Sequence, residues 1–206
     1  MSTHAIKNDL HHAAVEEHAH HGLDNKAIFG FWCYILTDLI MFAALFATYA
    51  VLEHNTFGNI GIRQTASLHF VLVQTLILLT SAFTYGLAIV ASKKNAVNKV
   101  MLWMGVTALL GLSFLGLEYH QLSQLAQAGH SWRNSAFLSV YFSLIVIHAV
   151  HIFIALLWAV VLMIQLPKQK LTDTMRTRLA CFGLFWDYTV LVWMLIFFIV
   201  YLMGAI

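Results

Sequence analysis

Residues 136–166 read AFLSVYFSLIVIHAVHIFIALLWAVVLMIQL and contain no aspartate, glutamate, lysine or arginine. Because a helix rises about 1.5 Å per residue, this stretch is long enough to cross the ~30 Å hydrocarbon core of a bilayer. A helix also satisfies its own backbone N–H and C=O groups, as lipid requires. The stretch therefore predicts a transmembrane helix.

The rest of the chain repeats this pattern. Hydrophobic residues make up 61% of the 206 residues and charged residues 10%, which is too apolar for one soluble core. We predict an all-α integral membrane bundle of five transmembrane helices, occupying residues 28–206. The expected helices are 28–52, 66–91, 100–117, 136–166 and 179–203.

Residues 1–27 are predicted to form a separate, disordered, His-rich cytoplasmic tail. The tail holds six of the twelve histidines: His4, His11, His12, His18, His20 and His21. Imidazole binds zinc, copper and nickel, but no carboxylate or thiol completes a recognisable ligand spacing. We expect a tail without fixed ligand geometry that binds metal only adventitiously.

Basic residues predict the orientation. With a cytoplasmic N-terminus, nine lysines and arginines lie on the cytoplasmic side, and only Arg63 and Arg133 lie on the other. The positive-inside rule then gives a periplasmic C-terminus. The formal net charge of +2 gives no reason to expect a nucleic-acid partner.

Several polar residues fall deep within the predicted helices. An isolated charge there costs several kcal/mol, so these groups should face the bundle interior and pair with one another. We predict one buried polar layer made of Asp38, Gln74, His148, His151 and Asp187.

His148 and His151 stand three residues apart on one helix face, a spacing found in metal sites and proton relays. We interpret them as a structural hydrogen-bonded pair. A lipid or subunit contact and a metal site are the alternatives.

Other residues are candidates for contacts outside the bundle. Glu118 follows the third apolar stretch, so we expect it at the periplasmic edge, either solvated or in contact with a lipid head group or a neighbouring subunit. The candidate lipid or subunit contacts are Trp32, Arg63, Glu118, Arg133 and Trp186.

The sequence contains no constellation that would make the chain a catalyst. It lacks axial histidines on two facing helices for haem, a copper-ligand set, a phosphate-binding glycine loop and a nucleophile with a nearby base. We therefore predict no metal, cofactor or catalytic residue in this chain.

Several strings together resemble one family. They are FGFW at 29–32, TD at 37–38, FATYAVL at 46–52, EY at 118–119, HAVH at 148–151, TR at 177–178 and VW at 192–193. In this order and spacing the sequence resembles subunit III of the haem-copper terminal oxidases, from about Lys26 to the C-terminus. By resemblance, Asp38 matches the family's buried helix carboxylate, His148 and His151 its paired histidines, and Glu118 its helix-end glutamate.

The resemblance implies a function. Five helices are typical of the quinol-oxidising, bo-type branch, so it implies a non-catalytic subunit of a proton-translocating ubiquinol oxidase in a bacterial cytoplasmic (inner) membrane. Haem and copper would lie in subunit I, the main partner, with subunits II and IV and phospholipids as further contacts. The subunit would stabilise the catalytic one and support sustained proton uptake.

Two departures from the family pattern stand out in the last helix. Asp187 stands where the family has histidine, and Val190 where it has aspartate; Gln74 also replaces a frequent glutamate. We expect Asp187 to pair with His148 or His151. A subunit-III-like protein of a nitric oxide reductase and a divalent-metal transporter are the alternative functions.

Overall fold

The computed structural model describes residues 3–52, 68–128, 136–169 and 171–202. Its elements are α1 (Thr3–Leu52), α3 (Leu68–Lys93), α4 (Val97–Gln127), α5 (Ala136–Gln169), α6 (Asp173–Ile196) and the π-helical η1 (Phe197–Leu202). Five helices are long and apolar enough to cross a membrane. The prediction of an all-α, multi-pass membrane protein is confirmed.

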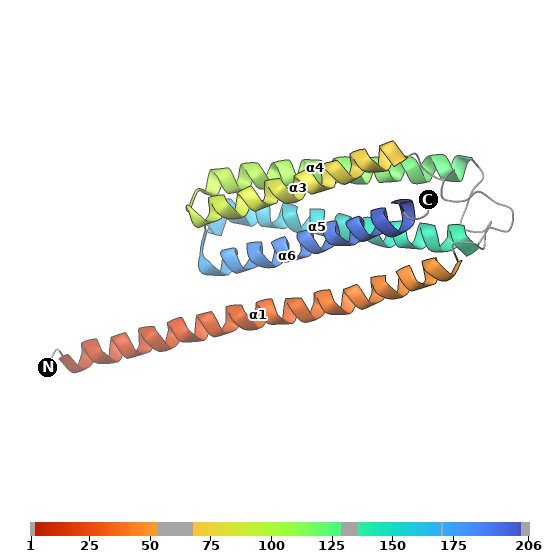
Figure 1. Ribbon diagram of the computed structural model, residues 1–206. Helices are drawn as coiled ribbons and strands as arrows, with labels where there is room; N and C mark the ends of the chain where they lie inside the picture. The colour runs from red at the N-terminus through yellow and green to blue at the C-terminus, as the bar shows by residue number, and fades with distance from the viewer. Residues whose placement is uncertain (1–2, 53–67, 129–135, 170, 203–206) are drawn as a thin grey trace.

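Successive helices run in opposite directions along one bundle (Figure 1). Helices α3 and α4 pack against each other, and α5 and α6 pack beside them. Helix α1 lies at the edge, against α5 and α6. Its buried positions Ile35, Asp38, Phe42 and Tyr49 recur every three, four or seven residues, so α1 joins the bundle through one narrow seam.

Two helix ends differ most from the prediction. Helix α4 ends at Gln127 rather than at 117, because polar residues beyond Leu117 are buried against other helices and so continue the helix. Helix α6 begins at Asp173 rather than at 179. The Thr172 hydroxyl accepts a hydrogen bond from the backbone N–H of Met175, which caps the helix and fixes its start.

Helix α1 is continuous from Thr3 to Leu52, whereas the sequence predicts a tail that ends at residue 27. The part that can span a membrane is Ile28–Leu52, as predicted. The preceding part projects beyond the other helices (Figure 1). The composition changes near residue 27 along α1, and the division into a tail and a transmembrane domain stays a prediction.

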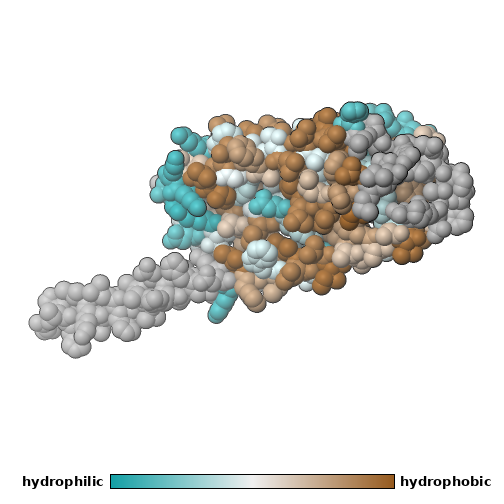
Figure 2. Space-filling view, viewed as in Figure 1, coloured by the Kyte–Doolittle hydropathy of each residue, from teal (hydrophilic) through white to brown (hydrophobic). Residues whose placement is uncertain are grey.

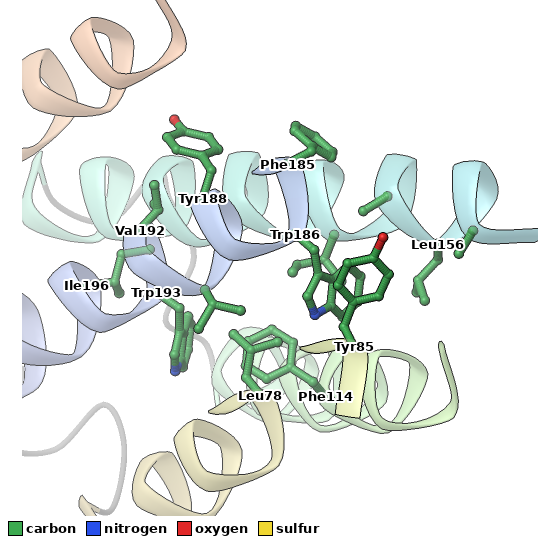
Figure 3. Close-up of a cluster of buried hydrophobic side chains, with 14 of the residues drawn as sticks. Leu78, Tyr85, Phe114, Leu156, Phe185, Trp186, Tyr188, Val192, Trp193 and Ile196 are labelled. Carbon is green, nitrogen blue, oxygen red and sulfur yellow. The ribbon is translucent and has the colours of Figure 1, made fainter. Parts of the chain in front are cut away.

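The centre of the bundle is aromatic (Figure 3). Trp186 and Trp193 of α6 point toward α3 and α4, and each donates its indole N–H to a hydroxyl of α3, Trp186 to Ser81 at 3.2 Å and Trp193 to Thr75 at 3.0 Å. Phe114 of α4 meets Trp193 edge to face. Aromatic rings with satisfied polar atoms thus tie α3, α4 and α6 together.

Hydrophilic residues gather at the end of the bundle where α3 turns into α4 (Figure 2). Asn95 forms this turn with a positive φ of 55°, a conformation that asparagine tolerates. Its side chain accepts a hydrogen bond from Arg176 of α6 at 2.7 Å. Lys93, Lys94 and Arg178 lie at the same end, which is the end that the sequence predicts to face the cytoplasm.

The orientation can be tested by labelling a single cysteine. In a Cys33→Ser/Cys181→Ser background, Lys94→Cys should react with a membrane-impermeant maleimide only in inside-out vesicles, because the α3–α4 turn is predicted to face the cytoplasm. Reaction in intact spheroplasts would reverse the proposed orientation.

Close packing of α4 against α6 can be tested at glycine. A Cβ at Gly111 would lie 2.6 Å from the ring of Trp186, whereas a Cβ at Gly116 on the same helix would have no neighbour within 4 Å. Gly111→Ala should therefore destabilise the protein by about 1–3 kcal/mol, as overpacking does. Gly116→Ala should leave stability unchanged or raise it by up to about 1 kcal/mol. Thermal unfolding in a mild detergent measures both, and equal effects would contradict the packing described.

Candidate functional site: buried polar clusters

Asp38 and His151 form a pair that joins α1 to α5. His151 Nε2 lies 3.2 Å from Asp38 Oδ1 and 3.0 Å from Oδ2, and both side chains are about nine-tenths buried. His151 Nδ1 lies 2.7 Å from the carbonyl oxygen of Ile147, which can only accept a hydrogen bond. Nδ1 must therefore carry a hydrogen, and the contact with Asp38 needs one more proton, held either on Nε2 or on the carboxylate.

Aromatic side chains enclose this pair. Phe42 of α1 meets the His151 ring at 5.4 Å, and Phe185 of α6 meets it at 6.3 Å. Tyr188 of α6 points toward α1 (Figure 3), where its ring meets that of Phe42 at 6.4 Å. The pair is therefore shielded from lipid, and its charge or shared proton stays inside the bundle.

His148 makes a different contact from the same helix face. Its Nε2 donates to the carbonyl oxygen of Thr189 at 3.0 Å, so it ties α5 to α6. Its ring packs against those of Phe114 and Trp193, at 5.9 and 5.3 Å, and is fully buried. The two histidines therefore hold α5 against two different helices.

A second polar cluster lies nearer the other end of the bundle. Gln74 of α3 donates to Glu118 Oε2 of α4 at 3.2 Å, and both residues are buried. One turn further on α4, Gln121 donates to the hydroxyls of Tyr141 and Tyr201, each at 3.1 Å, and these two hydroxyls lie 2.8 Å apart. This cluster joins α3, α4, α5 and η1.

Glu118 therefore does not occupy the position that the sequence predicts. It is 1% exposed and lies within α4, because the helix continues past Leu117 to Gln127. Burial and the bond to Gln74 correct its interpretation as a helix-end contact for lipid or a subunit.

Asp187 is exposed, which corrects its place in the predicted polar layer. It makes no hydrogen bond or ion pair with any residue that the structure describes. Its expected partners are engaged elsewhere, since His148 bonds to Thr189 and His151 to Asp38. The polar interior is thus not one layer, and its members are divided among separate contacts.

The candidate contact residues for lipid or another subunit differ in their exposure. Trp32 is 48% exposed on α1 and can meet lipid or another subunit. Trp186 is fully buried, which corrects its interpretation as a surface contact, because its indole fills the space over Gly111. Arg63 and Arg133 lie outside the described residues.

Three members of the second cluster were not predicted from the sequence: Gln121, Tyr141 and Tyr201. The signal for Gln121 was its spacing, since it lies three residues after Glu118 and shares a helix face with it. The tyrosines carry no comparable signal, because tyrosine is also common at membrane interfaces.

The side chains of these clusters can form hydrogen bonds and can hold protons. Within the part of the chain that the structure describes, no three His, Cys, Asp or Glu side chains are close enough to hold a metal ion. Their hydrogen bonds join α1 to α5, α5 to α6 and α3 to α4.

Comparison with known proteins identifies the group to which this bundle belongs. The family model of cytochrome c oxidase subunit III matches residues 4–205. The chain belongs to this family.

Related subunits are found in several bacteria. The chain is 42% identical over 209 residues to the "Cytochrome bo(3) ubiquinol oxidase subunit 3" of Pseudomonas aeruginosa, covering 100% of both proteins. It is 36% identical to the "Cytochrome c oxidase subunit 3" of Bacillus sp. PS3, over 94% of this chain and 93% of that one. It is 33% identical to the "Quinol oxidase subunit 3" of Bacillus subtilis, over 91% and 98%. The match therefore spans whole subunits.

The Asp38–His151 pair can be tested with a double-mutant cycle. Asp38→Leu should destabilise the protein by about 1–3 kcal/mol, because His151 Nε2 loses its partner while staying buried. Asp38→Asn should cost less, since an amide can still bond to the ring nitrogen. The double variant Asp38→Leu/His151→Leu should lose less than the sum of the single variants, as measured by thermal unfolding in detergent. Additive losses would show that the two side chains are not coupled.

Proposed function

We propose that this chain is a non-catalytic accessory subunit of a membrane-bound terminal ubiquinol oxidase that reduces oxygen to water and moves protons. The full-length match to a subunit named for a ubiquinol oxidase carries the proposal. The interior supports it, because the buried polar groups serve contacts between helices. Family membership favours this function over a nitric oxide reductase subunit or a metal transporter.

The redox chemistry then belongs to the partners. Haem and copper are expected in subunit I, with which this chain makes its main contact, and subunits II and IV complete the complex. The complex is placed in the bacterial inner membrane. Phospholipids are expected on the apolar outer faces of the helices, whose exposed leucines, valines and phenylalanines match lipid chains.

The contribution of this chain is to stabilise the catalytic subunit and to support sustained proton uptake. The bundle suits such a role because it is rigidly cross-linked, from the Asp38–His151 pair on one side to the Gln74–Glu118 pair on the other. A rigid apolar surface loses little conformational freedom when a partner binds it.

Purification in a mild detergent tests the proposal. The chain, tagged at its C-terminus, should bring down a haem-containing complex that consumes oxygen with ubiquinol as electron donor. A complex made without this chain should begin at a comparable rate and then lose activity during turnover, because the catalytic subunit has lost its support. Isolation of a haem-free protein would contradict the proposed function.

The alternatives predict different results in the same preparation. A nitric oxide reductase would consume nitric oxide rather than oxygen. A metal transporter would lose metal uptake on His151→Ala, whereas an accessory subunit would change only in stability or in the durability of turnover.

A further inference from the structure

Helix α6 is enclosed on most sides but keeps one exposed stripe. From residue 180 onward, the exposed positions of α6 and η1 all lie on it. Together with the half-buried Leu184 they alternate at spacings of four and three residues. We name this stripe the α6 seam: Ala180, Leu184, Asp187, Leu191, Met194 and Phe198. The alternation is the 3.5-residue repeat by which one helix packs along another.

The α6 seam lies between two other helices. Helix α6 packs against α1, α3 and α5, and α1 and α3 run along either side of it (Figure 1). Tyr85 of α3 lies over Gly183 of α6 and donates its hydroxyl to the carbonyl of Leu179, so α3 is held close on its side. This face is largely hydrophobic, with a small hydrophilic area in its middle (Figure 2).

Asp187 is the polar member of the α6 seam, and it lies at membrane depth. It stands about 21 Å along the helix from Asp173, near the middle of the 30-residue span. An exposed carboxyl at this depth, without a hydrogen bond or ion pair to the described residues, is costly in lipid. Residues of this kind pair with a partner, which here must come from outside the described chain.

We propose that the α6 seam is the docking surface for a transmembrane helix of a partner subunit, which places a hydrogen-bond donor opposite Asp187. The donor is a lysine, arginine, histidine or amide side chain. Leucine, methionine and phenylalanine supply the apolar contact, and Asp187 fixes the register of the two helices, as a polar residue does within a helix seam. The proposal rests on the proposed function in requiring a partner subunit.

A lipid does not meet the same requirement. Acyl chains carry no hydrogen-bond donor, and head-group amines lie at the interface, about 15 Å from mid-membrane. A second copy of the chain, packed by a two-fold axis along the same seam, would bring two Asp187 carboxyls toward each other. A partner helix with a donor satisfies both the apolar repeat and the buried acid.

Site-specific photo-cross-linking in membranes that contain the complete complex tests this surface. Benzoylphenylalanine at Leu184 and, separately, at Leu191 should each give a discrete adduct with another protein, and mass spectrometry should place the cross-link in a membrane-spanning segment. Asp187→Leu should lower both adduct yields about threefold or more, because the donor loses its acceptor. Asp187→Asn, which keeps an acceptor oxygen, should lower them less.

Leu109 provides the matched control. It is 65% exposed on α4, so a photoreactive residue there reports a surface away from the α6 seam, and its products should not respond to Asp187→Leu. Adducts with lipid alone, adducts between two copies of this chain, or yields that ignore Asp187→Leu would each overturn the proposed interface.

Haem content measured in the same membranes separates the two proposals. A haem-containing complex without a protein adduct at Leu184 or Leu191 overturns the interface and leaves the proposed function standing. A chain that purifies without haem overturns the proposed function. The single-site cross-links in the otherwise unchanged chain still test the interface if Asp187→Leu impairs folding.

Discussion

A polar side chain within a bilayer must find its partner inside the protein or in another subunit, because lipid offers none. The arrangement of this bundle follows from that constraint. Helix α1 lies at the edge and joins the others through a narrow seam, and the acidic residue in that seam, Asp38, is met by His151 of α5. Without this pair, α1 would place an acid against apolar side chains.

The remaining polar groups bond neighbouring helices to one another at different positions along the bundle. His148 is bonded to the backbone of α6, while Gln74 and Glu118 join α3 to α4 near the other end of the bundle. Between these levels the contacts are aromatic and closely packed, with Trp186 resting directly on Gly111. Separate polar contacts fix the register of the helices, and the apolar packing between them supplies most of the buried area.

This division explains how a subunit without redox centres can serve an oxidase. Asp38, Glu118 and both buried histidines bond within the bundle, so the surface left for partners is largely apolar and needs few specific contacts. Asp187 departs from this pattern, since it is a polar group that the described bundle leaves without a hydrogen-bonding partner. It therefore indicates where another subunit must complete the structure, on the face between α1 and α3.

The sequence alone determined the class of the protein and the family. Long apolar stretches such as 136–166 predict spans directly, because hydrophobic length is a local property of the chain. The sequence also predicted that Asp38, Gln74, His148, His151 and Asp187 would turn inward, because an unpaired polar group in lipid is costly. The structure exposes Asp187. The sequence could not show which of them would pair.

Only the tertiary structure decided those pairings, since they depend on how each helix is rotated and where it ends. The extension of α4 past Leu117 buried Glu118, which the sequence placed at an interface. A rotation of α6 that put Trp186 into the core put Asp187, the next residue, on the outside. Adjacent residues on a helix point about 100° apart, so one rotation settled both assignments.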